Sequence, residues 1–266
     1  MSRIKNALDA LKKDKRKALV IFLTAGDPSM AATGNLVKAA GEAGADIIEL
    51  GIPFSDPLAD GPLIQKSYHR AIGAGATVQG AIKQVELIRK SCDTPIVFMV
   101  SSTLVINHGV KKFMTEAAKA GVDGIILPDV PPEEAEEFSP EARAAGLDTI
   151  FLAAPTSNAQ RLKTIGRLSS GFLYYINVAG VTGGKSASAS QVGRQVKSVK
   201  RSAKVPVLAG FGVKTPQQAR ELSRVADGVI IGSRAVDIVS SARNAKTAVD
   251  ELSSFIKAVR KEMDKG

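Results

Sequence analysis

The sequence has very little of the residues that build disulfides, metal sites and membrane spans. Its 266 residues include one cysteine, Cys92, which excludes an internal disulfide and a cysteine-rich zinc site. The two histidines, His69 and His108, show no metal-ligand spacing and have no evident nucleophile partner. No apolar run approaches the length of a membrane span, and the N-terminus has no continuous apolar core like that of a signal peptide. We therefore expect a cytoplasmic protein that holds no metal.

Aromatic residues are also scarce, at 5% with no tryptophan, although the formal net charge is +10. A nucleic-acid-binding protein would gather its basic residues near aromatic side chains or within a known motif. Here the lysines and arginines are spread along many predicted helices, and no such motif is present. We expect neither a nucleic-acid nor a membrane partner, because solvated helix faces or attraction of an anionic substrate explain the charge more simply.

What the sequence does contain is a repeated unit, a short apolar run followed by an amphipathic helical pattern. The expected strands are 18–24, 45–51, 95–100, 124–128, 149–153, 171–177, 205–210 and 228–232. The expected helices include 30–43, 110–120, 133–145, 159–168, 191–203 and 216–225. Eight strands, each followed by a helix, predict a closed (β/α)₈ TIM barrel spanning residues 1–266 as one domain, with 4–11 as an extra N-terminal helix. The alternative is an open doubly wound sheet, which would have fewer strands and an early glycine-rich nucleotide turn.

Two carboxylates frame the most informative stretch, which runs from Glu49 to Pro62. Glu49 directly follows an apolar run and so stands at the carboxyl end of a buried strand, where parallel α/β folds place their chemistry. Prolines and glycines then form an irregular loop, and Asp60 at its far end is returned toward Glu49. Two carboxylates in different environments can supply an acid/base group and an electrostatic group. A capping aspartate beside a surface glutamate is the alternative, but a glutamate after Ile48 is expensive to bury without purpose.

Glycine clusters mark the ends of three late strands, at 180–184, 210–213 and 232–235. Glycine lets backbone N–H groups approach an anion closely, and a following helix N-terminus adds a favourable dipole. Phosphate in barrels commonly lies between the loops after the last two strands and a short helix, for which 235–239 is suitable. Tight turns without a ligand are the alternative. Three such turns at neighbouring strand ends favour a phosphate site.

The segment 179–186, which includes Lys185, also fits a relaxed nucleotide P-loop pattern. A true P-loop runs straight from a strand into a helix, whereas small residues prolong this segment and place it late in the repeat. We therefore expect a lid that closes over the site, with Thr182 able to hydrogen-bond a carboxylate below it. On the preceding strand, Tyr174 and Tyr175 must face opposite ways, so one of them lines the barrel mouth. Phe22, near the end of the first strand, offers a flat apolar wall to a ring.

At these residues the chain resembles the alpha subunit of tryptophan synthase, over essentially its whole length. The segments that carry the resemblance are 24–28, 49–62, 129–131, 180–183 and 210–212. The resemblance implies retro-aldol cleavage of indole-3-glycerol phosphate to indole and glyceraldehyde 3-phosphate. It also implies a pyridoxal-phosphate-dependent beta subunit that joins indole to serine, in an alpha2beta2 tetramer. The alpha chain itself is expected to need no metal and no organic cofactor.

The resemblance also implies a role for individual residues. Glu49 matches the acid/base that protonates indole C3 and takes the proton of the side-chain hydroxyl. Asp60 matches the carboxylate that accepts a hydrogen bond from the indole N–H, and Thr182 matches a lid threonine that closes onto Asp60. The implied substrate-binding residues are Phe22, Tyr174, Thr182, Gly183, Phe211, Gly212, Gly232 and Ser233.

Two segments depart from the usual pattern of the family. Family members often carry a tyrosine and an asparagine after the third strand, near the partner, where this chain has Ser101 and Thr103 in the run 100–103. The lid also has Val178-Ala179 in place of a common arginine. Three alternative functions stay open: a free-standing indole-releasing lyase, a non-catalytic activator of a beta chain, and a P-loop nucleotide-binding protein. The intact Glu49 and Asp60 argue against the activator.

Overall fold

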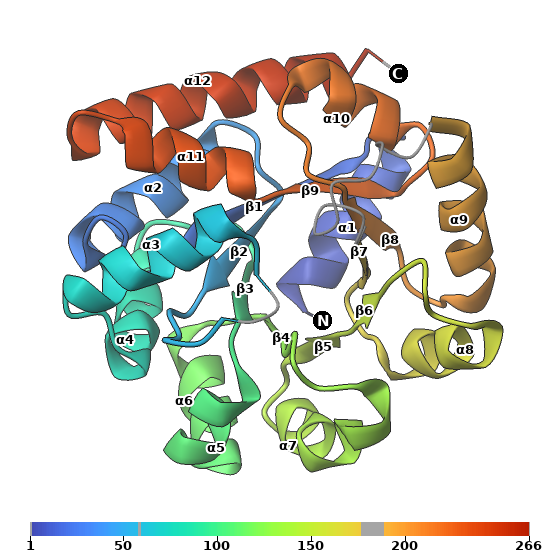
Figure 1. The fold of residues 1–266 in the computed structure, drawn as a ribbon, viewed down its shortest axis with the longest axis horizontal. Coiled ribbons are helices and arrows are strands. Elements are labelled where there is room, and N and C mark those ends of the chain that lie inside the picture. Colours follow the sequence, from blue (N-terminus) through green and yellow to red (C-terminus); the bar gives the residue numbers. More distant parts are fainter. Residues whose placement is uncertain (1, 58–59, 177–188, 266) are drawn as a thin grey trace.

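A ring of parallel strands forms the centre of the protein in a computed structural model that describes residues 2–57, 60–176 and 189–265 (Figure 1). The strands are β1 (Ala18–Thr24), β2 (Ile47–Gly51), β3 (Ile96–Met99), β4 (Gly124–Ile126), β5 (Asp148–Ile150), β6 (Leu152–Ala153), β7 (Leu173–Ile176), β8 (Val207–Gly210) and β9 (Gly228–Ile231). Their order is β5-β4-β3-β2-β1-β9-β8-β7-β6, and every pairing is parallel. Since β5 and β6 are separated only by Phe151, the two ends of this order meet and the sheet closes into a barrel.

Helices surround the ring, except α1, which lies at its centre in this view (Figure 1). They are α1 (Arg3–Lys13), α2 (Met30–Glu42), α3 (Pro62–Gly73), α4 (Val78–Ile88), α5 (Ser102–His108), α6 (Val110–Ala120), the 3₁₀ helix η1 (Pro132–Glu137), α7 (Ser139–Ala144), α8 (Ala159–Leu168), α9 (Ala189–Ser202), α10 (Pro216–Ser223), α11 (Ser233–Ser241) and α12 (Ala245–Met263). None of the helices in the described part of the chain combines the length and apolar character that a membrane crossing requires.

The predicted TIM barrel with an extra N-terminal helix is confirmed, and the open doubly wound sheet is wrong. Two elements differ from the sequence prediction. The expected strand 149–153 divides into β5, which pairs with β4, and β6, which pairs with β7. The expected helix 133–145 divides into η1 and α7 because Pro140 has no N–H to continue a helix from residue 136 and its ring would clash with that carbonyl.

Alternate side chains along the strands enter two separate apolar clusters. On β1, Val20 and Phe22 belong to the cluster inside the barrel, whereas Leu19 and Ile21 belong to the cluster between strands and helices. Helix α1 adds three side chains to the inner cluster and so plugs the amino end of the barrel. These are Ile4, Leu8 and Leu11. With the amino end closed, the opposite end, where the strands finish, is the open mouth.

Candidate active site

Glu49 is a charged group at the inward-facing end of β2, in a place that the strand register fixes. It lies opposite Phe22 in the β1–β2 pairing, and both side chains point into the barrel. Glu49 is 1% exposed, and its Oε2 has no hydrogen-bond partner among the described residues. A carboxyl group buried without a donor loses hydration that nothing replaces, so its neutral form is favoured.

Asp60 lies on the connection from β2 to α3, on the same side of the barrel. Its backbone N–H donates to the carbonyl of Pro57 at 3.1 Å. The Gln65 side chain, one turn into α3, donates from Nε2 to the carbonyl of Asp60 at 2.8 Å and to that of Pro57 at 3.3 Å. Gln65 thereby ties the end of the loop to the start of the helix. These hydrogen bonds fix the backbone from which the carboxylate of Asp60 projects.

The two carboxyl groups titrate differently because their surroundings differ. Burial raises the pKa of Glu49 to about 8, and the nearby negative charge of Asp60 adds to the rise. Burial alone raises the pKa of Asp60 to about 6. Near neutral pH, Glu49 is therefore mostly protonated while Asp60 is mostly ionised. One group can donate a proton and its neighbour can stabilise positive charge.

Three aromatic side chains surround this pair of acids. Phe22 and Tyr174 belong to the inner cluster, and Tyr68 of α3 is 3% exposed beside them. Both Glu49 and Asp60 raise the pKa of Tyr68 and of Tyr174, after the larger effect of burial, so the two phenols lie within electrostatic reach of both acids. The hydroxyls therefore stay neutral, and the rings form the apolar wall expected around a flat substrate.

Glycine at two strand ends makes room for these rings. A Cβ on Gly51 would lie 2.5 Å from Phe22 Cζ and 2.7 Å from the Tyr68 hydroxyl. A Cβ on Gly210 would lie 2.7 Å from Tyr174 Cε2. Any larger residue at either position would push an aromatic ring out of place. Both glycines are thus part of the site, although neither would touch a substrate through a side chain.

The neighbouring strand ends form an open place for an anion. Helix α11 starts at Ser233, immediately after β9 and Gly232, and its first N–H groups have no side-chain cap among the described residues. A Cβ on Gly232 would lie 3.5 Å from Phe22 Cβ, which places this helix start at the aromatic wall. Gly212 has φ +63°, and a Cβ there would meet nothing within 4 Å. Unpaired N–H groups at a helix start beside open space suit a phosphate.

The other residues singled out in the sequence lie away from the pair of acids or outside the described residues. Tyr175 points into the outer cluster, as the alternation with Tyr174 requires, and the ring of Phe211 packs against it with centroids 5.5 Å apart. Any contact of Phe211 with a substrate would therefore come from its backbone. Thr182 and Gly183, together with Lys185 of the P-loop pattern, lie outside the described residues. His69 is exposed on α3, and His108 contacts Glu116 on the neighbouring helix at 2.7 Å.

Sequence reasoning missed the role of α3 as the support of the site. The Thr24 hydroxyl donates to that of Ser67 at 2.6 Å, and Ser67 donates to the carbonyl of Ile64. Arg70 makes two hydrogen bonds to Asp27, at 3.0 and 2.7 Å. These contacts attach α3 to the end of β1 and so position the helix that carries Gln65 and Tyr68. The sequence did offer one signal for this role, because Gln65 is a polar residue within one helical turn of the loop that carries Asp60.

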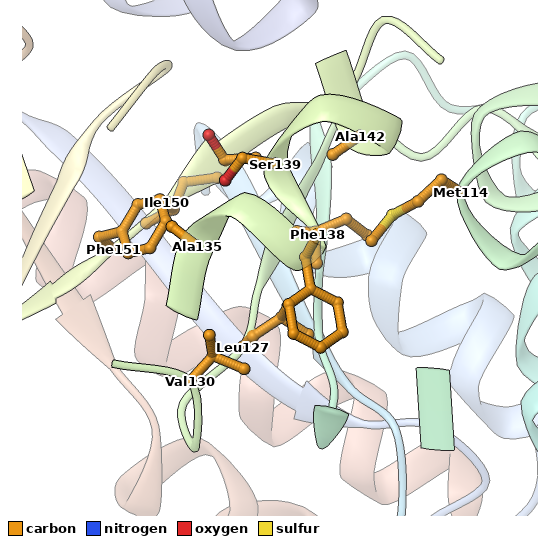
Figure 2. Close-up of a pocket in the computed structure, with 11 residues that line it drawn as sticks. Met114, Leu127, Val130, Ala135, Phe138, Ser139, Ala142, Ile150 and Phe151 are labelled. Atoms are coloured by element: carbon orange, nitrogen blue, oxygen red, sulfur yellow. The ribbon is translucent and has the colours of Figure 1, made fainter. Parts of the chain in front are cut away.

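A cleft of about 500 Å³ opens outward from Asp60. Asp60 and Tyr68 line it, together with residues 99–101, Thr103 and residues 128–129. There the carboxylate of Asp129 accepts from the Ser101 hydroxyl at 2.7 Å and from the Ser102 backbone at 3.0 Å. By contrast, a cavity of about 20 Å³ between α6, α7 and β5 is no larger than about one water molecule, and its lining is mostly apolar (Figure 2). Of these two, the cleft has the size and polarity of a route to the acids.

Comparison with known proteins gave one consistent result. The sequence model of a family described as "Tryptophan synthase alpha chain" matches residues 8–264. The tryptophan synthase alpha chain of Geobacter sulfurreducens is 45% identical over 260 residues, 98% of this chain and 98% of its own length. That of Pelobacter propionicus is 42% identical over 266 residues, covering 100% and 99%. A crystal structure of tryptophan synthase subunit alpha from Legionella pneumophila superposes with a TM-score of 0.94 at 34% identity, covering 100% of both chains.

Proposed function

The chain belongs to the tryptophan synthase alpha chain family, and we propose that Glu49 and Asp60 perform the reaction of that family here. The protein is a carbon–carbon lyase of tryptophan biosynthesis that cleaves indole-3-glycerol phosphate into indole and glyceraldehyde 3-phosphate. The single observation that supports the assignment of residues is the burial of Glu49 at a strand end near Asp60 of the following loop, which raises the pKa of Glu49 further than that of Asp60.

Glu49 is the proton donor and acceptor of the proposed mechanism. Its protonated carboxyl gives a proton to C3 of the indole ring, which converts the ring into a cationic indolenine. The bond between C3 and the hydroxyl-bearing carbon of the side chain then breaks, and its electron pair restores the aromatic ring. The hydroxyl proton passes to the Glu49 carboxylate as the aldehyde forms. Glu49 therefore ends each turnover in the state in which it began.

Asp60 stabilises the charge that develops between these two steps. Ionised at neutral pH, it accepts the hydrogen bond of the indole N–H, whose nitrogen carries the positive charge of the indolenine. Phe22 and Tyr174 hold the ring between apolar faces, and the start of α11 with Gly212 and Gly232 binds the phosphate through backbone N–H groups. Thr182 and Gly183 complete this set as proposals from the resemblance alone.

The partner is a beta subunit, as in other members of this family. We infer an alpha2beta2 tetramer in the cytoplasm, with residues 1–266 as one domain. The cleft that leads outward from Asp60 past Ser101 and Thr103 is the proposed exit for indole and faces the beta subunit. The small side chains there replace larger ones common in the family, so we expect a weaker or differently paired interface.

The experiment is to titrate the purified chain with the beta subunit from the same source while following indole release and complex mass. We expect slow cleavage by the isolated chain and faster cleavage in the complex, because the partner favours the closed arrangement of the loops. Full activity without a complex at micromolar concentration would favour the free-standing lyase. No indole release under either condition would contradict the lyase assignment itself.

A further inference from the structure

A second, larger groove lies at the amino end of the barrel, opposite to the acids of the mouth. Its volume is about 880 Å³, and it runs between the polar face of α1 and the starts of the strands β5, β7, β8 and β9. The apolar side chains of α1 close this end of the barrel by packing. Packing alone does not require an open groove with a polar lining beside the helix, so the groove needs a separate explanation.

Seven lysine or arginine side chains line the groove against three aspartates. Lys5 pairs with Asp9, and Lys200 pairs with Asp227 at 2.6 Å. Arg16 pairs with Asp264, outside the lining, at 3.1 Å. Four lysines of the lining have no ion-pair partner within residues 2–57, 60–176 and 189–265: Lys12, Lys15, Lys17 and Lys204. The groove therefore carries uncompensated positive charge on two sides, from the end of α1 and from the segment before β8.

Two residues that line the groove, Ser169 and Asp148, each carry a buried polar atom without a partner in the described part of the chain. Ser169 is 7% exposed, and its Oγ is buried without a hydrogen bond. The Oδ2 of Asp148 is likewise buried without a donor. A hydroxyl and a carboxylate oxygen in this state carry a desolvation cost that a bound molecule could remove.

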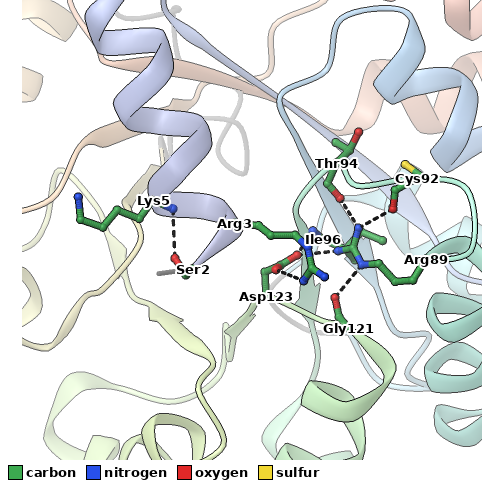
Figure 3. A network of polar contacts seen from close by, with 9 residues as sticks. All are labelled: Ser2, Arg3, Lys5, Arg89, Cys92, Thr94, Ile96, Gly121 and Asp123. Atoms are coloured by element: carbon green, nitrogen blue, oxygen red, sulfur yellow. Dashed lines mark hydrogen bonds and ion pairs between the residues drawn. The ribbon is translucent and has the colours of Figure 1, made fainter.

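Asp148 also breaks a pattern that three other aspartates follow at the same end. Asp46, Asp123 and Asp227 each directly precede a strand and accept an N–H from the neighbouring strand, at 2.7, 2.8 and 2.9 Å. Each of the three also contacts a cationic side chain, as Asp123 does with Arg89 and Arg3 (Figure 3). Asp148, at the start of β5, has an Oδ2 that makes neither contact. Asp148 is one of the residues that line the groove.

Lys15, in the turn after α1, has a backbone conformation that is unfavourable for a lysine. It has φ +57°, in the left-handed region that glycine or asparagine usually occupies at a helix end. A non-glycine residue there costs stability, of order 1 kcal/mol. The turn carries Lys15 and Lys17 along the groove wall after α1 ends at Lys13.

From these observations we propose that the amino-end groove binds a small molecule with at least two phosphate groups and a hydroxyl or amine donor. The unpaired lysines hold the phosphates as point charges, while Asp148 accepts from the donor and the Ser169 hydroxyl donates to a phosphate oxygen. The bound molecule bridges α1 to the starts of the strands and so stabilises the fold without touching the catalytic mouth.

A nucleic acid fits this groove less well than a small molecule does. None of the described residues that line it is aromatic, so they offer no surface on which bases would stack. Its volume falls within the range of small-molecule sites, roughly 300–1,000 Å³. A carboxylate at its base would also repel a continuous phosphate backbone but would accept a hydroxyl.

The test is calorimetric titration of the whole chain with fructose 1,6-bisphosphate, in saturating glycerol 3-phosphate to occupy the phosphate site of the mouth. We expect binding that weakens at least about tenfold in a Lys12→Gln/Lys15→Gln/Lys204→Gln variant, equal to about 1.4 kcal/mol. A matched variant, Lys83→Gln/Lys246→Gln/Lys257→Gln, removes the same charge from exposed sites away from the groove and should bind normally. Indole release should be unchanged in both, which separates this site from the catalytic one.

The acceptor role of Asp148 has its own discriminating measurement. Asp148→Asn should weaken binding of the hydroxyl-bearing bisphosphate but strengthen binding of inorganic tripolyphosphate, which gains from the lost negative charge and needs no acceptor. An equal response of both probes would overturn the role of Asp148. Absent binding to the unaltered chain, or equal losses in the two lysine variants, would overturn the site. A single-stranded RNA that binds through the same lysines and displaces the bisphosphate would assign the groove to nucleic acid instead.

Discussion

Two buried acidic residues at opposite ends of the barrel, Asp123 and Glu49, have opposite surroundings. At the amino end, Asp123 accepts from the Ile96 N–H at 2.8 Å, from Arg89 at 2.6 Å and from Arg3 at 3.0 Å. At the carboxyl end, Glu49 is as deeply buried, yet its Oε2 has no partner in the described residues. The first arrangement holds strands and helices together, whereas the second keeps a proton on a carboxyl group at neutral pH. The contacts of Asp123 thus stabilise the fold, whereas Glu49 is placed where such contacts are withheld.

The largest expected effect is on the catalytic end. Glu49→Gln should lower indole release by about 10²–10⁴-fold, because the amide cannot donate and recover a proton. Binding of glycerol 3-phosphate should stay nearly normal, which serves as the control for an intact site. Near-normal turnover by the purified variant would remove Glu49 from the mechanism.

The same substitution should stabilise the fold at alkaline pH. The pKa of Glu49 is raised on folding to about 8, so the folded chain binds more protons than the unfolded chain between roughly pH 4.5 and 8. The free energy of unfolding therefore falls as pH rises through this window, and the contribution of Glu49 is most unfavourable above it. Removing the charge should raise the unfolding free energy by about 1–3 kcal/mol at pH 8.5, with little change at pH 4.5. Chemical denaturation at the two pH values measures the difference.

At the amino end, Asp123→Asn should lower stability and leave activity unchanged, which is the opposite of the effect of Glu49→Gln. It leaves Arg89, whose side chain is 10% exposed, without its carboxylate partner, and should destabilise the fold by about 3 kcal/mol. Activity per folded molecule should not change. Asp9→Asn is the matched control, because the Asp9 side chain is 59% exposed in its pair with Lys5 and should cost under about 1 kcal/mol. Equal losses of unfolding free energy in the two variants would contradict this division of roles.

The barrel could be predicted from the sequence because its pattern is local and repeats eight times. Short apolar runs such as 18–24, which are too short for typical helices and recur between helical patterns, indicate buried strands, and the glutamate after Ile48 stands out against them. The break at Phe151 could not be predicted, since it depends on which neighbouring strand each half pairs with. Gln65 and Tyr68 were missed for a similar reason, because a glutamine or tyrosine on an amphipathic helix looks ordinary until the helix is placed. Asp148 looks the same in sequence as Asp46 and Asp123, and only the structure separates them.

Two substitutions of Gly232 test the proposed phosphate site at the mouth of the barrel. Gly232→Val should weaken glycerol 3-phosphate binding by roughly 10–100-fold, since the side chain would enter the space beside Phe22 and the start of α11. Gly232→Ala should be much milder, because its Cβ would make ordinary contacts at 3.5 Å and the residue already has φ −109°. Gly212 is the poorer test, as its φ of +63° would strain any substitute. Equal affinities for Val and Ala, measured by calorimetry, would place the anion elsewhere.

The rate should also depend on pH in a way that reports both acids. Asp60 must be ionised and Glu49 protonated, so kcat/KM should follow a bell with limbs near pH 6 and pH 8. Outside the bell, kcat/KM should fall about tenfold per pH unit. In the weak residual activity of Asp60→Asn the acidic limb should vanish while the alkaline limb remains. Persistence of both limbs in that variant would show that another group sets the acidic one.

The smallest expected effect concerns the contact that holds Asp60 in place. Gln65→Leu removes the two hydrogen bonds from the Gln65 side chain to the carbonyls of Pro57 and Asp60 but leaves both catalytic acids. The loop should then sample more arrangements, and kcat should fall about three- to tenfold with less change in KM, because only the reacting geometry depends on Asp60. Gln217→Leu, on the exposed face of α10, is the matched control and should leave kcat unchanged. Gln65 acts through Asp60, so its loss should cost little more activity in the Asp60→Asn background than that variant has already lost. A full and independent loss of rate in the double variant would instead mean that Gln65 contacts the substrate itself.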